Sequence, residues 1–333
     1  MNLPKITIAI PVLNEEANLG KCLSRIFSQG YPEKKIEVLI VDAGSADNTL
    51  KIAKKFGVRI LFNKVMKDPE SGKMVALKHA TGEYFMYLDA DMFLPTNNNW
   101  FAKMLKPFEN PKIEGTFTKF IVNPKDRALN RYLSYDALQR DPLYRFLTPG
   151  IESIIVSNEK GYSICKLRME NPPPIGLCLC RTKLLRRFFK SDRLIDMEVP
   201  LTFLKKGYPF FAYVPDAGIN HLHAKNIRNL LKKRIRNIDQ MNRGKSGYLP
   251  DYEKRLFKWA DFKNKATIFK LGFWMIYANI FLPLLVTGII KSIRYRDSCF
   301  LLEPIVGLLV TDVVAWGFIR NKKGLKVILG GVK

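Results

Sequence analysis

The sequence predicts an α/β protein with a mostly parallel central sheet, followed by apolar C-terminal segments. Short β-branched runs alternate with helical patterns over the first hundred residues, which is typical of parallel strands joined by right-handed crossovers. The runs are apolar throughout, as strands covered on both faces are. Two apolar segments near the C-terminus, 271–290 and 299–319, are long enough to span a bilayer core of about 30 Å.

Composition narrows the possible partners. The chain has 333 residues, is 47% hydrophobic and carries a net charge of +25, so a polyanionic partner is expected: nucleic acid, an anionic membrane or phosphorylated substrates. No nucleic-acid-binding motif occurs, and we expect no nucleic-acid partner. The five cysteines form no C-x-x-C pair, which favours buried, reduced thiols over a zinc site.

The elements of the first hundred residues follow in order. A stripe at Leu19, Leu23 and Ile26 marks the first helix. Neither G-x-G-x-x-G nor a P-loop is present, so a dinucleotide-binding fingerprint is absent. Strands are predicted at Ile6–Ile10, Ile36–Val41, Arg59–Phe62 and Tyr84–Leu88, and further helices at Thr49–Phe56 and Ser71–Ala80.

Three polar clusters follow predicted strands: Pro11–Glu15, Asp42–Ser45 and Asp89–Asp91. The C-terminal ends of parallel strands share one edge of a sheet, where open α/β folds bind ligands, so we expect the clusters to converge. An ordinary loop explains each cluster taken alone, because Asp is common in turns. Their recurrence at one edge favours a ligand site.

The chemistry of these clusters fits a nucleoside diphosphate. Asp89 and Asp91, spaced i, i+2, offer hard oxygen donors to a divalent cation that also holds a phosphate. Asp42 is suited to accept from a base N–H or a ribose hydroxyl, and Gly44 allows close backbone approach. Lys73 is placed to lie along the phosphates, although a solvated helix start is an equal reading.

Five motifs follow one another along the chain. They are I-P-V-L-N-E-E (10–16), Q-G-Y-P (29–32), V-D-A-G-S-A-D-N-T (41–49), A-T-G-E-Y (80–84) and L-D-A-D (88–91). In this order they resemble glycosyltransferase family 2, the inverting enzymes of the GT-A fold. The resemblance implies that Pro11, Glu15 and Asp42 hold the base, that Asp89 contacts the nucleoside, and that Asp91 ligates Mg²⁺ or Mn²⁺, with Asp89 as a further candidate metal ligand. Ala43 departs from the family, which often has a second Asp there.

The resemblance also implies a general base. The family places an acid before a helix and a G-Y pair, and this chain has Asp196 followed by Lys206-Gly207-Tyr208. Asp196 aligns with the base, with Glu198 in reserve. The family often has a His near the diphosphate, and we prefer His221 to His223 as a further metal candidate, against an equal reading as a structural His.

The C-terminal third points to a membrane. Residues 227–243 predict a basic amphipathic helix suited to an anionic interface. The two apolar segments form a transmembrane hairpin, the second weakened by Glu303 and Asp312. Both flanks of the hairpin are more basic than its loop, 291–298, so the catalytic domain is expected in the cytoplasm. The short apolar N-terminal run, interrupted by Lys5, is no secretory signal.

The predicted function is a metal-dependent, inverting, membrane-anchored glycosyltransferase. It would transfer a sugar from a nucleotide-sugar donor to an acceptor, which is a polyprenyl phosphate, a lipid-linked sugar or a surface glycan. The alternative is a non-catalytic nucleotide-sugar-binding membrane scaffold of the same fold. The predicted organisation is a catalytic domain, 1–223 (nucleotide-binding half 1–95, acceptor half 96–223), an interface segment, 224–267, a transmembrane hairpin, 268–320, and a basic cytoplasmic tail, 321–333.

Overall fold

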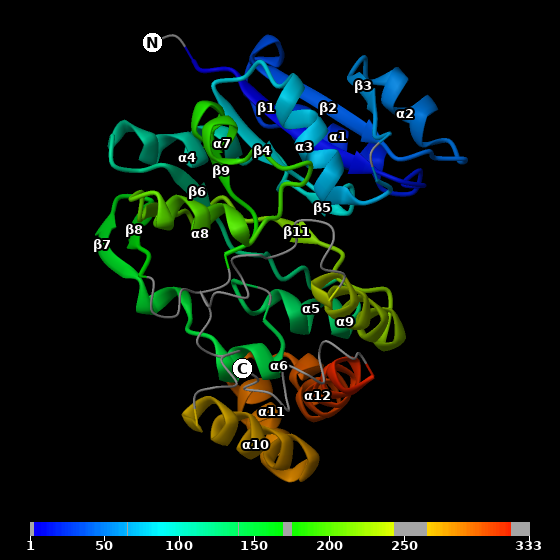
Figure 1. Cartoon of the computed structure of the whole chain (residues 1–333), viewed down its shortest axis with the longest axis vertical. Helices are drawn as coiled ribbons and strands as arrows, with labels where there is room; N and C mark the ends of the chain where they lie inside the picture. The colour runs from blue at the N-terminus through cyan, green and yellow to red at the C-terminus, as the bar shows by residue number, and fades with distance from the viewer. Residues whose placement is uncertain (1–2, 65, 139, 169–174, 243–264, 321–333) are drawn as a thin grey trace. The chain divides into compact units, whose positions relative to one another are not determined.

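The computed structural model describes residues 3–64, 66–138, 140–168, 175–242 and 265–320 (Figure 1). The predicted tail, 321–333, and residues 243–264 of the predicted interface segment lie outside this part. The chain divides into two compact units. Unit 1 comprises residues 1–121, 154–168 and 174–221, and unit 2 comprises 122–153, 169–173 and 222–333.

Unit 1 is built on a nine-stranded sheet of order β3-β2-β1-β4-β9-β6-β10-β8-β7. The predicted strands of the first hundred residues are confirmed, and β3 has the predicted bounds. The strands are β1 Ile6–Val12, β2 Ile36–Asp42, β3 Arg59–Phe62, β4 Tyr84–Tyr87, β6 Gly115–Phe117, β7 Ile155–Glu159, β8 Tyr162–Lys166, β9 Leu179–Arg181 and β10 Phe210–Tyr213.

The half of the sheet formed by β3, β2, β1 and β4 is parallel throughout. Ile6 of β1 pairs with Ile36 of β2 and with Tyr84 of β4, so the three strands end at the same edge. Beyond β4 the sheet is mixed: β9 runs antiparallel to β4 and β6, while β10 runs parallel to β6. The parallel half therefore brings the three polar clusters to one edge, as predicted.

Helices of unit 1 cover this sheet. The stripe predicted for the first helix is buried, with Leu19, Leu23 and Ile26 in the main core. Trp100 is fully buried and its indole N–H donates to the Gly218 carbonyl at 2.8 Å. The helices are α1 Leu19–Phe27, α2 Thr49–Lys55, α3 Pro69–His79, α4 Trp100–Leu105, α7 Thr182–Phe188 and α8 Glu198–Lys205.

Close packing at two glycines fixes the edge that carries the clusters. A Cβ added at Gly72 of α3 would lie 3.0 Å from Cβ of Pro11 on β1. A Cβ added at Gly82, just before β4, would lie 2.5 Å from the backbone nitrogen of Thr7. The approach at Gly82 requires glycine, because a methyl group would have to displace the backbone of β1, whereas at Gly72 the Pro11 side chain would have to shift by a few tenths of an ångström.

Unit 2 is helical. Leu230 of α9 packs in one core with Tyr132, Val306 and Val310, so α9 places part of its apolar face against the unit's own helices. The helices are α5 Ala128–Ser134, α6 Pro142–Leu147, α9 Ile227–Asn242, α10 Lys265–Asn279, α11 Leu282–Tyr295 and α12 Glu303–Ile319, with a 3₁₀ turn at Ser298–Leu302.

The two predicted spans differ in this unit. Among the described residues, the segment Ser298–Gly317 is long and apolar enough to cross a membrane, although 44% of it is buried in the protein. The other segment is broken: Ile268–Asn279 and Leu282–Tyr295 meet at a bend of 77°. Phe281, with φ of 65°, lies at the break. The transmembrane hairpin stays a prediction.

Candidate functional site

Asp89 and Asp91 lie in a tight turn after β4. The turn closes with a hydrogen bond of 2.9 Å from the Met92 amide to the Asp89 carbonyl, and leads into the short strand β5, Met92–Phe93. Strand β5 pairs antiparallel with β11, Asn220–His221, so that His221 stands opposite Met92. This pairing delivers an imidazole from far along the chain to the two carboxylates.

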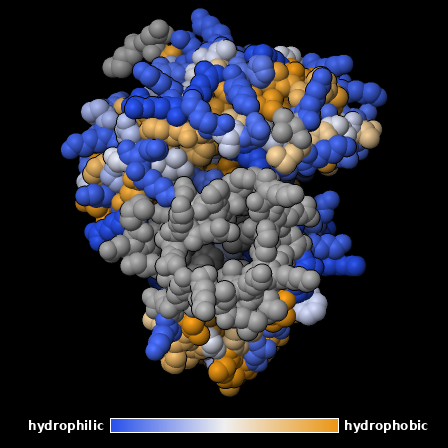
Figure 2. All heavy atoms as spheres, in the orientation of Figure 1, coloured by the Kyte–Doolittle hydropathy of each residue, from blue (hydrophilic) through white to orange (hydrophobic). Residues whose placement is uncertain are grey.

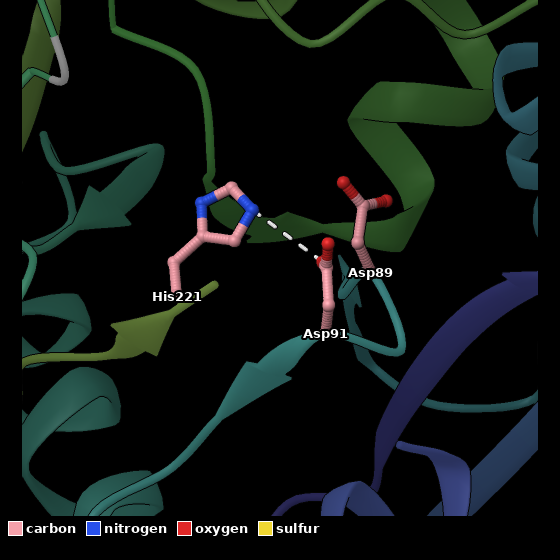
Figure 3. A group of neighbouring side chains, drawn as sticks. All are labelled: Asp89, Asp91 and His221. Carbon is pink, nitrogen blue, oxygen red and sulfur yellow. Dashed lines mark ion pairs between the residues drawn. The ribbon is translucent and has the colours of Figure 1, made fainter. Parts of the chain in front are cut away.

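The three side chains form a cluster with metal-binding spacing (Figure 3). One ligand atom from each of Asp89, Asp91 and His221 lies within 4.8 Å of the others. Nε2 of His221 lies 3.4 Å from Oδ1 of Asp91. The two carboxylates are donors that suit Mn²⁺ and Mg²⁺, and the imidazole adds a nitrogen donor of the kind that transition metals accept. His221 is only 8% exposed, so the surrounding atoms hold its ring in place.

His223, the other candidate, has a different environment. It belongs to unit 2 and is 2% exposed. Its Nε2 lies 3.0 Å from the hydroxyl of Ser134. The structure therefore brings His221, and not His223, to the carboxylates.

The loops after β1 and β2 are tied to each other. The Asn14 amide donates to the Ser45 hydroxyl at 3.0 Å, and the Ala46 amide donates to the Asn14 side chain at 2.8 Å. Pro11 lies on β1, one residue before its end. Glu15 follows in the loop and accepts a hydrogen bond from Asn18 at 3.1 Å.

Asp42 ends β2 and is 2% exposed. Its carboxylate accepts from the Gly44 amide at 2.9 Å and from the Ser45 amide at 3.1 Å, and Gly44 has φ of 101°. Asp42 thus shapes the loop at the place predicted for the base.

The thiol of Cys22, on α1, is buried behind the site. Burial raises its pKa, and the negative charges of Asp91, Asp89 and Glu15 raise it further. The thiol therefore stays protonated at neutral pH.

Asp196 meets a lysine in the same unit. It precedes α8, whose first residue is the reserve candidate Glu198. Lys73, on α3, is 2% exposed and its Nζ lies 2.5 Å from Oδ1 of Asp196. The predicted place of Lys73 along the phosphates stays a prediction, and the contact that the structure gives it is with the candidate base.

The acid–base properties of Asp196 suit a general base. Burial raises its pKa, the Lys73 ammonium lowers it, and Asp89 and Glu70 raise it, giving a value of about 6. A carboxylate with this pKa is mostly ionised at neutral pH and accepts a proton more readily than an ordinary Asp.

Tyr87 is a site residue that the sequence reasoning missed. It lies on β4 and its ring centroid is 4.6 Å from Nζ of Lys73. Its hydroxyl donates to the Gly176 carbonyl at 2.7 Å. In the sequence it is one aromatic residue in an apolar strand, so no local signal distinguishes it from core.

A parallel half-sheet that ends in paired carboxylates suits an enzyme that binds a nucleoside diphosphate and its cation. The family described as glycosyl transferase family 2 matches residues 7–163. A Methanococcus voltae protein, dolichyl N-acetyl-alpha-D-glucosaminyl phosphate 3-beta-D-2,3-diacetamido-2,3-dideoxy-beta-D-glucuronosyltransferase, is 33% identical over 342 residues, covering 95% of this chain and 96% of that protein. The chain belongs to glycosyl transferase family 2 and is a glycosyltransferase.

Two further comparisons agree. Glycosyltransferase AglE of Haloferax volcanii is 29% identical over 144 residues, which are 41% of this chain and about half, 47%, of that protein. The mannosyltransferase PcManGT from Pyrobaculum calidifontis, solved with GDP-Man and Mn²⁺, has a TM-score of 0.54. At 19% identity, covering 94% of this chain and 87% of that one, it shows the same fold.

Proposed function

We propose that this enzyme transfers a sugar, with inversion, from a nucleotide-sugar donor to a hydroxyl of a lipid-linked sugar at the cytoplasmic membrane face. The observation that carries the proposal is the cluster of Asp89, Asp91 and His221, in the same unit as the Lys73–Asp196 pair. It joins a site for a diphosphate and its cation to a site for proton removal. A purely structural role requires neither.

The donor would bind along the edge of the parallel half. Pro11, Glu15 and Asp42 would hold the base, and Asp89 the nucleoside. Asp91, with His221 and Asp89, would ligate Mg²⁺ or Mn²⁺, which when bound supplies positive charge that stabilises the leaving diphosphate. The solved mannosyltransferase holds GDP-Man and Mn²⁺, which supports a nucleotide sugar and a metal here.

The reaction would be a single displacement. Asp196 takes the proton from the acceptor hydroxyl as the acceptor oxygen bonds to the anomeric carbon of the donor sugar. The bond from that carbon to the phosphate oxygen breaks, and the nucleoside diphosphate leaves with the electron pair. Attack opposite the leaving group inverts the anomeric carbon, so an α-linked donor gives a β-linked product.

The acceptor and the location are supported by one relative and by charge. The Methanococcus voltae protein is named for a dolichyl N-acetylglucosaminyl phosphate and a β-linked product, which favours a sugar hydroxyl over a bare polyprenyl phosphate. A lipid-linked acceptor implies a membrane, and the net charge of +25 suits an anionic leaflet. Basic flanks favour the cytoplasmic face.

A screen for the substrates tests the proposal. Purified full-length protein in detergent is mixed with each nucleotide sugar, with and without Mn²⁺, and its thermal unfolding is recorded. Stabilisation by one donor, and only with Mn²⁺, is expected, because a ligand that binds the native state raises the unfolding temperature. The stabilising donor is then incubated with polyprenyl-linked sugars and with polyprenyl phosphate. Transfer to the phosphate alone would contradict the proposed acceptor.

A further inference from the structure

The segment formed by α10, α11 and the two residues between them carries 13 of the 24 large apolar side chains that the described part of the chain leaves exposed. Phe269 is 76% exposed, Ile276 66% and Ile293 74%. Figure 2 shows hydrophobic residues at the surface where Figure 1 labels these helices. A concentration of exposed apolar side chains of this kind marks an interaction site, because isolated soluble domains rarely expose one.

Over its described residues, neither helix is long enough to cross a bilayer. At 1.5 Å per residue, the 15 residues of α10 and the 14 of α11 are about 22 Å and 21 Å long, against a hydrocarbon core of about 30 Å. The bend of 77° between them keeps the pair from acting as one straight span. Its apex, at Ile280–Leu282, is apolar and exposed.

Both ends of the bent helix pair carry positively charged side chains. Lys265 and Lys270 stand exposed at the start of α10, and Arg294 and Arg296 stand exposed at the end of α11. Cationic side chains are stable at the headgroups of an anionic leaflet, and an apolar apex is stable among the acyl chains. A wedge that enters and leaves the same leaflet satisfies all of these groups.

Contacts within unit 2 fix the side on which α11 ends. Arg131 donates two hydrogen bonds of 2.9 Å to the carboxylate of Asp297, one to each oxygen. Arg131 lies on α5, in the stretch 122–153, which the chain joins to unit 1 on either side. No described helix before α10 is long and apolar enough to cross a membrane, so α5 stays on the side of the catalytic unit. Asp297 must then lie on that side too.

A second group of contacts repeats the constraint one turn later. Glu303, at the start of α12, is 3% exposed and accepts from Arg145 of α6 and from Lys291 of α11, each at 2.7 Å. Buried charges of this kind hold their partners together, because separating them leaves an uncompensated ion. Lys291 is the residue that would begin the far loop of a two-span hairpin.

The last apolar helix also runs along the unit. Val306 and Val310 of α12 are fully buried beside Leu230 of α9, a helix with many basic residues. Val314, a turn further, packs in a cluster with Leu143 of α6. One face of α12 therefore packs into the unit's core, while Ile305 and Trp316 on other faces stay exposed.

We propose that unit 2 is a one-leaflet membrane anchor, in which α10 and α11 form a wedge that enters the anionic leaflet facing the catalytic unit and returns to the same side. The occupant of the exposed apolar surface is therefore lipid. The segment 291–298 lies at the headgroups beside α5 and α6, and not across the membrane.

Cysteine accessibility tests the proposal. All five native cysteines are buried, so single exposed cysteines can be read against them. Arg294→Cys and Ser298→Cys are placed in the full-length chain, and Lys78→Cys, 58% exposed in unit 1, marks the side of the catalytic unit. Sealed membrane vesicles carrying each variant are treated with a membrane-impermeant maleimide before and after detergent.

The wedge predicts that all three variants label in the same vesicles and to the same extent before detergent. Labelling of Arg294→Cys and Ser298→Cys only after detergent, where Lys78→Cys labels before it, would overturn the proposal. The two probes are on different elements, so one misfolded variant does not remove the test. The experiment measures maleimide labelling and not sugar transfer, so its outcome is independent of the proposed function.

Binding to lipid tests the occupant. Purified chain is mixed with vesicles of neutral lipid, with or without an anionic lipid, and floated on a density gradient. Flotation with anionic vesicles is expected, and Ile276→Glu with Ile293→Glu should abolish it, because a charge in the acyl region is costly. If the double variant floats like wild type, or if the surface instead holds a second copy of the chain as a dimer that excludes vesicles, the proposal fails.

Discussion

The ammonium of Lys73 and the carboxylate of Asp196 form an ion pair, with 2.5 Å between Nζ and Oδ1, although the two residues are 123 positions apart in the sequence. The lysine is almost fully enclosed, with a side chain 3% exposed, while that of the aspartate is 32% exposed. The lysine thus contacts one carboxylate oxygen, and part of the aspartate side chain stays open to solvent.

This pair makes a prediction about pH. The pKa of Asp196 is about 6, and Lys73 is the group that lowers it against burial, Asp89 and Glu70. A general base acts when ionised, so kcat of the wild type should fall about tenfold per pH unit below pH 6. In Lys73→Met the pKa of Asp196 rises, and the acidic limb should move to higher pH by about one unit or more.

Two variants separate this role from others. Lys73→Arg keeps the charge and should keep the acidic limb near its wild-type pH. Lys78 lies on the same helix as Lys73 and forms an exposed ion pair with Asp192. Lys78→Met breaks this pair and should leave the pH profile of kcat unchanged. If Lys73→Met alters the KM for the donor and leaves the pH profile alone, the lysine acts on the donor phosphates instead.

Removal of Asp91 should abolish metal-dependent nucleotide binding. Asp91 is the carboxylate that lies nearest His221, and its loss leaves a site with one carboxylate. We expect Asp91→Ala to weaken Mn²⁺-dependent binding of a nucleoside diphosphate by at least about tenfold, since changes even outside the ligand set cost that much. Calorimetric titration measures the affinity. Asp216→Ala removes an exposed carboxylate of the same unit, and an equal loss there would contradict the assignment.

Gly82→Ala should destabilise the edge that carries the aspartates. The added Cβ would lie 2.5 Å from the Thr7 nitrogen and 2.7 Å from its hydroxyl oxygen, in a parallel pair of strands. Overpacking of this kind costs about 1–3 kcal/mol in the free energy of unfolding. Gly176→Ala is the matched control, because no atom lies within 4 Å of its added Cβ. Denaturant unfolding measures both, and equal stability of the two variants would contradict the packing.

The parallel half of the sheet was predictable because its elements carry local signals. Arg59–Phe62 has the bounds predicted for it, and Pro11, Asp42 and Asp89 lie at or near strand ends because alternation alone sets their side of the sheet. The mixed half was not, since β9 inserts between β4 and β6 by contacts far apart in sequence.

The site divides in the same way. Asp89 and Asp91 stand in one motif, and family resemblance adds Asp196. The contact of Lys73 with Asp196 and the position of Tyr87 depend on tertiary packing, which no spacing encodes. Likewise, hydropathy detects the apolar segment 271–290, but the bend at Phe281 and the Arg131–Asp297 pair emerge only in three dimensions.

The most direct test of the central claim is sugar transfer by membranes that carry the wild type, Asp91→Ala or Asp196→Asn at equal protein levels, with the donor found by thermal stabilisation. We predict transfer by the wild type that requires Mg²⁺ or Mn²⁺. Loss of the candidate base in Asp196→Asn should lower transfer at least about 100-fold, and loss of a candidate metal ligand in Asp91→Ala should lower it at least about tenfold. Equal transfer by all three would contradict a catalytic site built on these two aspartates.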